Sequence, residues 1–294
     1  MQKMKIGFIG TGVMGGSMAA NLLKNGYEVA VFNRTKAKAR TLLDRGARWE
    51  PTVAAAAAQA DVVITMVSYP KDVEAIYFGP GGILENARPG TYVVDMTTSS
   101  PDLAKTIDRE AKEKQLHALD APVSGGDTGA RNGTLCIMVG GEEAAFRTLA
   151  PVFSAMGKEV VFQGEAGAGQ ECKMCNQIAI ASNIMGVCEA LAYAGHAGLD
   201  REKVLHILES GGAASWQLSA YAPRIFKGDY APGFYVKHFV KDMRIALEEA
   251  DAMGLNLPAL RLSKSLFDQL MSAHEENAGT QALYKLYDKT GPED

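Results

Sequence analysis

Between residue 5 and about residue 163, short apolar runs alternate with stretches of helical periodicity. The predicted strands are residues 5–10, 28–33, 60–67, 92–96, 119–123, 135–141 and 159–164. The predicted helices between the first four strands are residues 17–26, 36–46 and 71–78, together with a short buried helix in the alanine-rich residues 52–61. Continuous apolar strands separated by helices are typical of a parallel sheet that is covered on both faces.

After about residue 164 the pattern predicts helices only. Residues 167–198 favour one helix of about 25–30 residues, because they contain no proline and have glycines at both ends. Further helices are predicted at residues 200–210, 215–227, 237–253 and 258–275. The sequence therefore predicts an α/β domain over residues 1–164, followed by an all-helical domain over residues 165–294.

A glycine-rich turn follows the first predicted strand and opens the first predicted helix. It has the pattern G-x-G-x-x-G, and its residues are Gly10, Thr11, Gly12, Val13, Met14 and Gly15. Small residues let the backbone approach a pyrophosphate, and the helix N-terminus supplies N–H groups and a positive dipole end. The alternative is a glycine-rich turn without a ligand, but the position between strand and helix favours a dinucleotide. We therefore predict a doubly wound Rossmann domain.

The end of the second predicted strand indicates which dinucleotide is bound. An acidic residue there would hold the ribose hydroxyls of NAD, whereas this chain has Asn33, Arg34 and Thr35. An arginine can stack on adenine and pair with a 2′-phosphate, and Thr35 offers a hydroxyl donor. The alternative is a solvated charge at a strand end. We predict NADP as the coenzyme, with NAD possible.

Composition narrows the class of protein without identifying it. Apolar residues make up 47% and charged residues 22% of the chain, and the formal net charge is −4. No run of Lys or Arg suggests a nucleic-acid partner. No signal peptide is visible, and no uncharged stretch reaches the roughly 18 apolar residues of a membrane span. We expect a cytoplasmic protein with no membrane partner, whose four cysteines stay reduced.

Five motifs in order along the chain resemble those of the β-hydroxyacid dehydrogenase family. They are FIGTGVMG at 8–15, DMTTSSP at 95–101, DAPVSGG at 120–126, GAGQECKMCNQ at 167–177 and KDM at 241–243. The resemblance covers essentially the whole chain. This family includes 3-hydroxyisobutyrate dehydrogenases, tartronate semialdehyde reductases and glyoxylate/succinic semialdehyde reductases. Asn176-Gln177 resembles the tartronate semialdehyde branch, and Asn33-Arg34-Thr35 resembles the NADPH-using glyoxylate reductases.

For the sheet domain, the resemblance implies a coenzyme contact and a substrate contact. Thr98 would contact the nicotinamide ribose region. Ser124, Gly125 and Gly126 would hold the substrate carboxylate, since glycines free backbone N–H groups to converge on an anion. Without the resemblance, the same residues would also suit an ordinary loop.

For the helical half, the resemblance implies the catalytic group. Lys173 would be the general acid and base, with Asn176 and Gln177 orienting the substrate. Lys241 would close over the coenzyme, and Asp242 would lie beside it at the substrate.

The C-x-x-C pair in the same motif offers a competing chemistry. At about 100° per residue, with Cys172 at zero, Asn176, Lys173 and Gln177 fall at about 40°, 100° and 140°, whereas Cys175 falls near 300°. We therefore interpret the thiols as buried packing residues rather than a redox pair. The five histidines show no clustered ligand spacing, so no metal is predicted.

The leading hypothesis is thus an NADPH-dependent oxidoreductase that interconverts small carboxylated semialdehydes and β- or related hydroxyacids. One alternative is an imine reductase of similar fold, although imine reductases typically lack this lysine. Another is a non-catalytic NADP-binding scaffold. The substituent of the substrate stays open among methyl, hydroxymethyl and CH₂-carboxylate. Long apolar faces in the helical half predict a homodimer or homotetramer.

Overall fold

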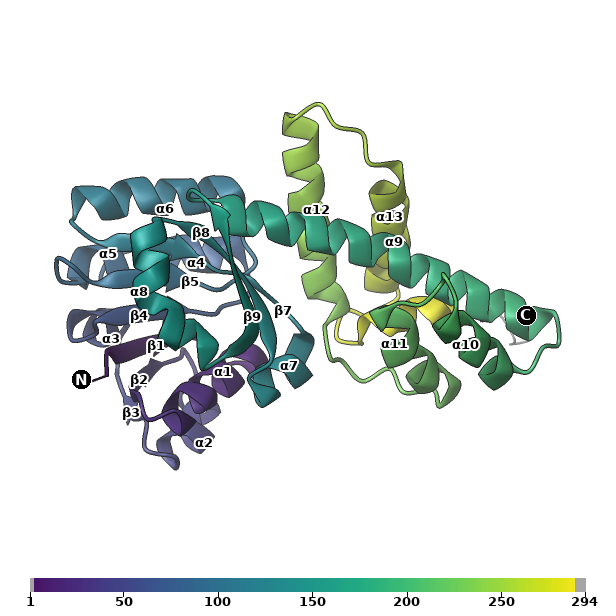
Figure 1. Ribbon diagram of the computed structural model, residues 1–294, viewed down its shortest axis with the longest axis horizontal. Helices are drawn as coiled ribbons and strands as arrows, with labels where there is room; N and C mark the ends of the chain where they lie inside the picture. Colours follow the sequence, from purple (N-terminus) through teal and green to yellow (C-terminus); the bar gives the residue numbers. More distant parts are fainter. Residues whose placement is uncertain (1–2, 289–294) are drawn as a thin grey trace. The chain divides into compact units, whose positions relative to one another are not determined.

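The computed structural model describes residues 3–288 of the chain (Figure 1). The chain divides into two compact units, residues 1–173 and residues 174–294. The first unit contains the sheet and its helices, and the second contains helices. Each unit is described by itself below.

The first unit is built on a nine-stranded sheet with strand order β3-β2-β1-β4-β5-β6-β8-β7, and β9 pairs with β8 (Figure 1). Its strands are β1 Lys5–Ile9, β2 Glu28–Phe32, β3 Arg48–Trp49, β4 Val62–Thr65, β5 Tyr92–Asp95, β6 His117–Asp120, β7 Val123–Ser124, β8 Leu135–Gly141 and β9 Gly157–Gly164. From β3 to β6 every pair is parallel. This order places β1 and β4 side by side at the centre, which is the crossover point of a doubly wound sheet.

Helices cover both faces of this sheet and complete the first unit. They are α1 Val13–Lys24, η1 Lys36–Ala39, α2 Arg40–Leu43, α3 Val53–Ala58, α4 Pro70–Phe78, α5 Ile83–Asn86, α6 Pro101–Glu113, α7 Gly126–Asn132 and α8 Glu143–Ser154. In β4 the side chains of Val62 and Ile64 enter the cluster with α1 and α8, and Val63 enters the cluster with α3, α4 and α6. All three are fully buried, which explains the unbroken apolar run at this strand.

The predicted Rossmann fold is confirmed in its strand order, but two local predictions are wrong. The predicted strand 119–123 is split at Pro122, because proline has no N–H to continue the ladder, and β7 and β6 both pair antiparallel with β8. The sheet is therefore mixed at this edge. The predicted helix 36–46 is a 3₁₀ turn followed by the four-residue α2.

The second unit consists of packed helices, preceded by the start of a long helix that begins in the first unit. Its elements are α9 Ala168–His196, α10 Arg201–Ser210, α11 Trp216–Phe226, α12 Val236–Ala252, α13 Pro258–Ser272 and η2 Thr280–Leu286. Asp200 and Ser215 cap α10 and α11 with their side-chain oxygens. Phe239 of α12 meets Phe267 of α13 edge to face at 5.1 Å between ring centroids, in a core that α9 shares.

Within residues 3–288, α9 is the one helix whose length and composition would allow it to cross a membrane. Only 39% of its most apolar 18-residue window is buried. A single helix of this kind is weak evidence for a membrane span, since the core helix of a globular unit passes the same test.

Candidate functional site

The glycine-rich turn joins β1 to α1 with almost no room for side chains at its two ends. Gly10 has φ +100°, and a Cβ there would lie 2.1 Å from the carbonyl oxygen of Met66 after β4. A Cβ at Gly15 would lie 2.0 Å from the carbonyl oxygen of Gly10. These two glycines are therefore required by the protein itself, because α1 packs directly on its own loop.

Gly12 is different, and it tests whether the turn fits a coenzyme phosphate. Its backbone has an ordinary φ of −70°, and a Cβ built there would have no atom within 4 Å. Gly12 is the N-cap of α1, and no side chain caps this helix. Next to it, the Thr11 hydroxyl is buried without a hydrogen-bond partner. Open space, an uncapped helix start and an unsatisfied hydroxyl at one place fit an anionic ligand.

The residues after β2 lie beside this turn. The Asn33 side chain accepts a hydrogen bond from the Thr11 backbone N–H at 3.1 Å and donates one to the Thr35 carbonyl oxygen at 3.0 Å. Arg34 extends into solvent with its side chain 84% exposed, and its guanidinium lies 3.6 Å from Asp72 in the first turn of α4. The structure thus brings Asn33 together with the glycine-rich turn and leaves the Arg34 guanidinium accessible.

The loop after β5 is organised around a buried carboxyl group that the sequence analysis did not single out. Asp95 accepts hydrogen bonds from the Thr65 hydroxyl at 2.7 Å and from the Thr97 backbone N–H at 3.1 Å. Burial raises the pKa of Asp95 to about 6, and the nearby Asp120 adds to the rise, although the hydrogen bonds oppose it. Thr98, the proposed ribose contact, is half-buried between two buried neighbours.

The raised pKa of Asp95 predicts a pH-dependent stability difference between the wild type and Asp95→Asn. Asparagine can still accept both hydrogen bonds but does not titrate. The folded pKa of about 6 exceeds the usual 3.8, so the contribution of Asp95 is fully present below about pH 3.8 and lost as the pH rises through about 6. Between about pH 4 and 7, the wild type should lose up to about 3 kcal/mol relative to the variant.

Urea unfolding of both proteins across this pH range measures the difference, and the contributions of carboxylates that do not interact with Asp95 cancel. A difference in unfolding free energy that stays constant with pH would contradict the assignment to Asp95.

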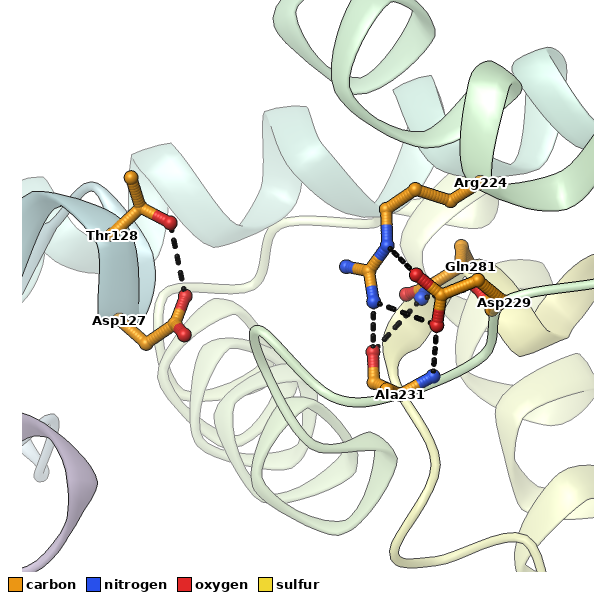
Figure 2. A network of polar contacts seen from close by, with 6 residues as sticks. All are labelled: Asp127, Thr128, Arg224, Asp229, Ala231 and Gln281. Carbon is orange, nitrogen blue, oxygen red and sulfur yellow. Dashed lines mark hydrogen bonds and ion pairs between the residues drawn. The ribbon is translucent and has the colours of Figure 1, made fainter. Parts of the chain in front are cut away.

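The proposed carboxylate-binding turn lies between β7 and α7. Gly125 and Gly126 have φ +124° and +62°, which only glycine adopts readily, and Ser124 precedes them at half-buried depth. The next residue, Asp127, accepts a hydrogen bond from the Thr128 hydroxyl at 3.4 Å (Figure 2). Asp127 also forms an ion pair with Arg131 at 2.6 Å. This ion pair balances the negative charge next to the turn.

The first turn of α9 is bound to the sheet unit through two buried side chains. Asp120, at the end of β6, accepts hydrogen bonds from the backbone N–H groups of Gly167 and Gln170, each at 2.8 Å. The Gln170 amide accepts from the Ser99 backbone N–H at 3.0 Å and donates to the Thr97 carbonyl oxygen at 2.8 Å. Neither side chain had a predicted role, although both lie inside the motifs at 120–126 and 167–177.

Lys173 lies one helical turn after Gln170 on α9. Its side chain is buried, with 6% of the residue exposed. Burial of an ammonium group costs free energy unless hydrogen bonds or an opposite charge compensate for the lost hydration. The structure therefore places a buried lysine in the same unit as the coenzyme turn and the Thr98 loop.

In the helical unit, two hydrogen bonds and one ion pair connect four of the predicted residues of α9 and α12. The side-chain amide of Asn176 donates to the side-chain amide oxygen of Gln177 at 2.6 Å. The side-chain amide of Gln177 in turn donates to a carboxylate oxygen of Asp242 at 2.6 Å. The other oxygen of Asp242 lies 2.9 Å from the Lys241 ammonium group. Lys241 and Asp242 are 5% and 2% exposed, so the pair is shielded from water. Burial lowers the pKa of the neighbouring His238, and Lys241 lowers it further.

The loop that leads into α12 is fixed by a second polar cluster, shown in Figure 2. Arg224 binds the Asp229 carboxylate through two nitrogens, at 2.9 and 3.2 Å, and its hydrogen bond lowers the pKa of that carboxyl. Arg224 also donates to the Ala231 carbonyl oxygen, which Gln281 binds as well, at 3.1 Å. The segment between α11 and α12 is thereby held at several points before the chain reaches Lys241.

The cysteine pair differs from its predicted burial. Cys175 is exposed and Cys172 is half-buried, so the interpretation of both as buried packing residues is wrong for Cys175. The helix phase explains this, because the face opposite the lysine is not covered. Over residues 3–288 no group of three or more His, Cys, Asp and Glu side chains could hold a metal ion.

Comparison with protein families covers both halves of the chain. Residues 5–164 match the family model described as the NAD binding domain of 6-phosphogluconate dehydrogenase. Residues 167–287 match the one described as NAD-binding of NADP-dependent 3-hydroxyisobutyrate dehydrogenase. The second match contains Lys173, Asn176, Gln177, Lys241 and Asp242.

Individual relatives match this chain in sequence or structure over nearly its full length. The chain is 50% identical to the probable 3-hydroxyisobutyrate dehydrogenase-like 1, mitochondrial, of Arabidopsis thaliana, over 95% of this chain and 84% of the relative. It is 40% identical to 2-hydroxy-3-oxopropionate reductase of Escherichia coli, over 95% and 94%. The structure of Mycobacterium tuberculosis 3-hydroxyisobutyrate dehydrogenase with L-serine matches with a TM-score of 0.89 and 29% identity, over 97% of this chain and 99% of that chain.

Proposed function

Since the chain belongs to the 3-hydroxyisobutyrate dehydrogenase family of NAD(P)-binding oxidoreductases, we propose that it is an NADPH-dependent enzyme that interconverts small carboxylated semialdehydes and β- or related hydroxyacids. The observation that carries this proposal is the buried Lys173. It lies one turn beyond the start of α9, where Asp120 accepts the backbone N–H of Gln170. A buried lysine at this position suits proton transfer to a bound carbonyl oxygen, which a non-catalytic scaffold would not require.

Lys173 is proposed as the general acid of aldehyde reduction and the general base of alcohol oxidation. When bound, the nicotinamide would supply a hydride to the carbonyl carbon in reduction, or accept one from the hydroxyl-bearing carbon in oxidation. The Lys173 ammonium donates a hydrogen bond to the carbonyl oxygen and transfers its proton as this oxygen becomes an alkoxide. In the reverse direction the neutral amine takes the hydroxyl proton.

The remaining predicted residues are proposed to position the two reactants. Ser124, Gly125 and Gly126 would hold the carboxylate with a hydroxyl and backbone N–H groups, in a turn whose positive φ angles require glycine. Asn176 and Gln177 would orient the substrate, with Asp242 fixing the amide of Gln177.

The coenzyme contacts are proposed for the turn from Gly10 to Gly15, for Asn33 to Thr35, for Thr98 and for Lys241. The open space at Gly12 and the unsatisfied Thr11 hydroxyl support the first of these contacts. The accessible guanidinium of Arg34 supports the second, as the group that reads a 2′-phosphate.

Oxidation of NADPH with a panel of aldehydes tests the proposed activity. The panel contains glyoxylate, 2-hydroxy-3-oxopropionate, methylmalonate semialdehyde and succinic semialdehyde, with butanal as a match for succinic semialdehyde without the carboxylate. We expect the carboxylated aldehyde to exceed butanal in kcat/KM by about 10- to 150-fold, the effect of one charge-assisted hydrogen bond. Equal turnover of the matched pair, or turnover of a cyclic imine alone, would contradict the proposal.

Arg34→Asp is expected to weaken NADPH binding by about 10- to 150-fold, because a charge-assisted hydrogen bond of about 1.5–3 kcal/mol is lost. NADH binding should change much less or improve. Titration of nicotinamide fluorescence gives both dissociation constants. The matched control is Arg40→Asp, which changes the charge by the same amount. Arg40 is also exposed and forms a surface ion pair with Asp44. Equal losses for NADPH and NADH would remove Arg34 from this role.

We also propose that the enzyme is a homodimer or homotetramer that associates through its helical unit. Large apolar side chains are exposed there, at Tyr193, Leu199, Ile207 and Trp216. Light scattering at several protein concentrations tests this proposal, and a monomer at all of them would contradict it.

A further inference from the structure

The first turn of α9 is attached to the sheet unit by a pair of buried side chains, which we call the α9 clamp: Asp120 and Gln170. Asp120 is 4% exposed and binds two backbone N–H groups at the helix start with its two carboxylate oxygens. Burial raises its pKa, and the N–H groups of Gly167 and Gln170 oppose that rise. A side chain from β6 thus serves as the cap of α9.

The contact between Asp120 and the helix is made possible by two glycines. A Cβ at Gly140 would lie 2.6 Å from one oxygen of Asp120, and a Cβ at Gly169 would lie 2.8 Å from the other. The helix start is therefore packed around the carboxylate with no space for a further side chain.

Gln170 makes the second attachment, and it joins the helix to the loop after β5. The side chain is fully buried and uses both ends of its amide, accepting from Ser99 N–H and donating to the Thr97 carbonyl oxygen. These two backbone groups flank Thr98. A primary amide carries its donor and its acceptor on separate atoms, so this one side chain can bind both backbone groups and hold both sides of the loop.

We propose that Gln170 is a positioning residue that fixes Lys173 relative to the Thr98 loop; this inference rests on the proposed function of that lysine. Gln170 and Lys173 are three residues apart on one helix, which is about 4.5 Å along its axis. The Lys173 backbone is thereby tied, through Gln170, to the loop proposed to contact the nicotinamide ribose. Proton transfer depends on such placement, since a displacement of about 1 Å can cost about 100-fold in rate.

Three variants test the role of Gln170. Gln170→Leu keeps the volume but removes both hydrogen bonds. Gln170→Glu accepts from Ser99 in either form, but it donates to Thr97 only when protonated. Glu171→Gln is the matched control, because Glu171 also joins this turn to the sheet unit, through an exposed ion pair with Lys105 at 3.1 Å.

We expect Gln170→Leu to lower kcat by about 10- to 100-fold while the dissociation constant for NADPH stays within about 3-fold. Hydrogen exchange of coenzyme-free protein should show faster exchange in peptides containing Ser99. For Gln170→Glu, kcat relative to the wild type should recover as the pH falls from about 8 to 6. If Gln170 only stabilised the fold, this pH profile would be absent in Gln170→Glu. Circular dichroism at each pH checks that the variant stays folded over the whole range. Glu171→Gln should match the wild type.

A normal kcat for Gln170→Leu, beside an inactive Lys173→Ala, would overturn the positioning role and leave the proposed function intact. Unchanged exchange at Ser99 would overturn it as well. Should Gln170→Leu fail to fold, a flat pH ratio for Gln170→Glu would still overturn the inference. Full activity of Lys173→Ala would instead remove the lysine chemistry on which the inference rests.

Discussion

Replacing Lys173 with alanine is expected to lower kcat by about 10²- to 10⁴-fold, the usual loss when a positioned general acid or base is removed. The fold should survive, because alanine favours helix. NADPH affinity should hardly change, since the phosphates are expected at the turn from Gly10 to Gly15. Steady-state kinetics with the best aldehyde of the panel, and fluorescence titration of NADPH, measure the two effects separately.

The double substitution Cys172→Ser, Cys175→Ser is the matched control on the same helical turn. Cys175 is exposed, so serine there costs little, and the double variant should keep kcat within a few-fold. An inactive but folded double-serine variant, together with an active Lys173→Ala, would refute the lysine mechanism and support a thiol chemistry.

Asp242→Ala is expected to lower the unfolding free energy of the helical unit by about 3–5 kcal/mol. The substitution leaves the Lys241 ammonium buried without its counter-charge and removes the acceptor of Gln177. Urea unfolding followed by circular dichroism measures the loss, and hydrogen exchange in peptides of α9 and α12 locates it.

The control for this change lies on the same helix. Asp251 of α12 pairs with Arg261, and both side chains are about half exposed. Asp251→Ala should cost at most about 1 kcal/mol, as is usual for exposed ion pairs. If Asp242→Ala costs no more than Asp251→Ala, neither the buried ion pair nor the hydrogen bond between Gln177 and Asp242 stabilises the helical unit as proposed.

The elements that were well predicted are those whose own sequence determines them. Short buried runs such as residues 62–65 are strands or helices of a core, and their shortness and β-branched residues favour strands. The turn from Gly10 to Gly15 is recognisable because close backbone contacts exclude other residues at both ends. The long helix from Ala168 to His196 follows from the absence of proline.

Other features depend on contacts between distant residues and leave little trace in a single sequence. The antiparallel pairing of β8 with β6 and β7 is decided by the direction in which the chain returns after α7. The residues of β8 themselves have the pattern of any apolar strand. Asp120 and Gln170 are 50 residues apart, so no local pattern announces their contact. Asp95 could have been suspected, because a carboxylate directly after an apolar strand must find partners.

The uncapped start of α1 makes the stability of the sheet unit depend on what the unit binds. Serine, asparagine or aspartate at position 12 would close the helix from within, but their side chains would occupy the N–H groups that a phosphate uses. With Gly12 no side chain caps the first N–H groups of the helix, and we propose that the coenzyme phosphate completes their hydrogen bonds. Coenzyme and helix end then act as one cooperative element, and the melting temperature of the unit should rise with coenzyme concentration.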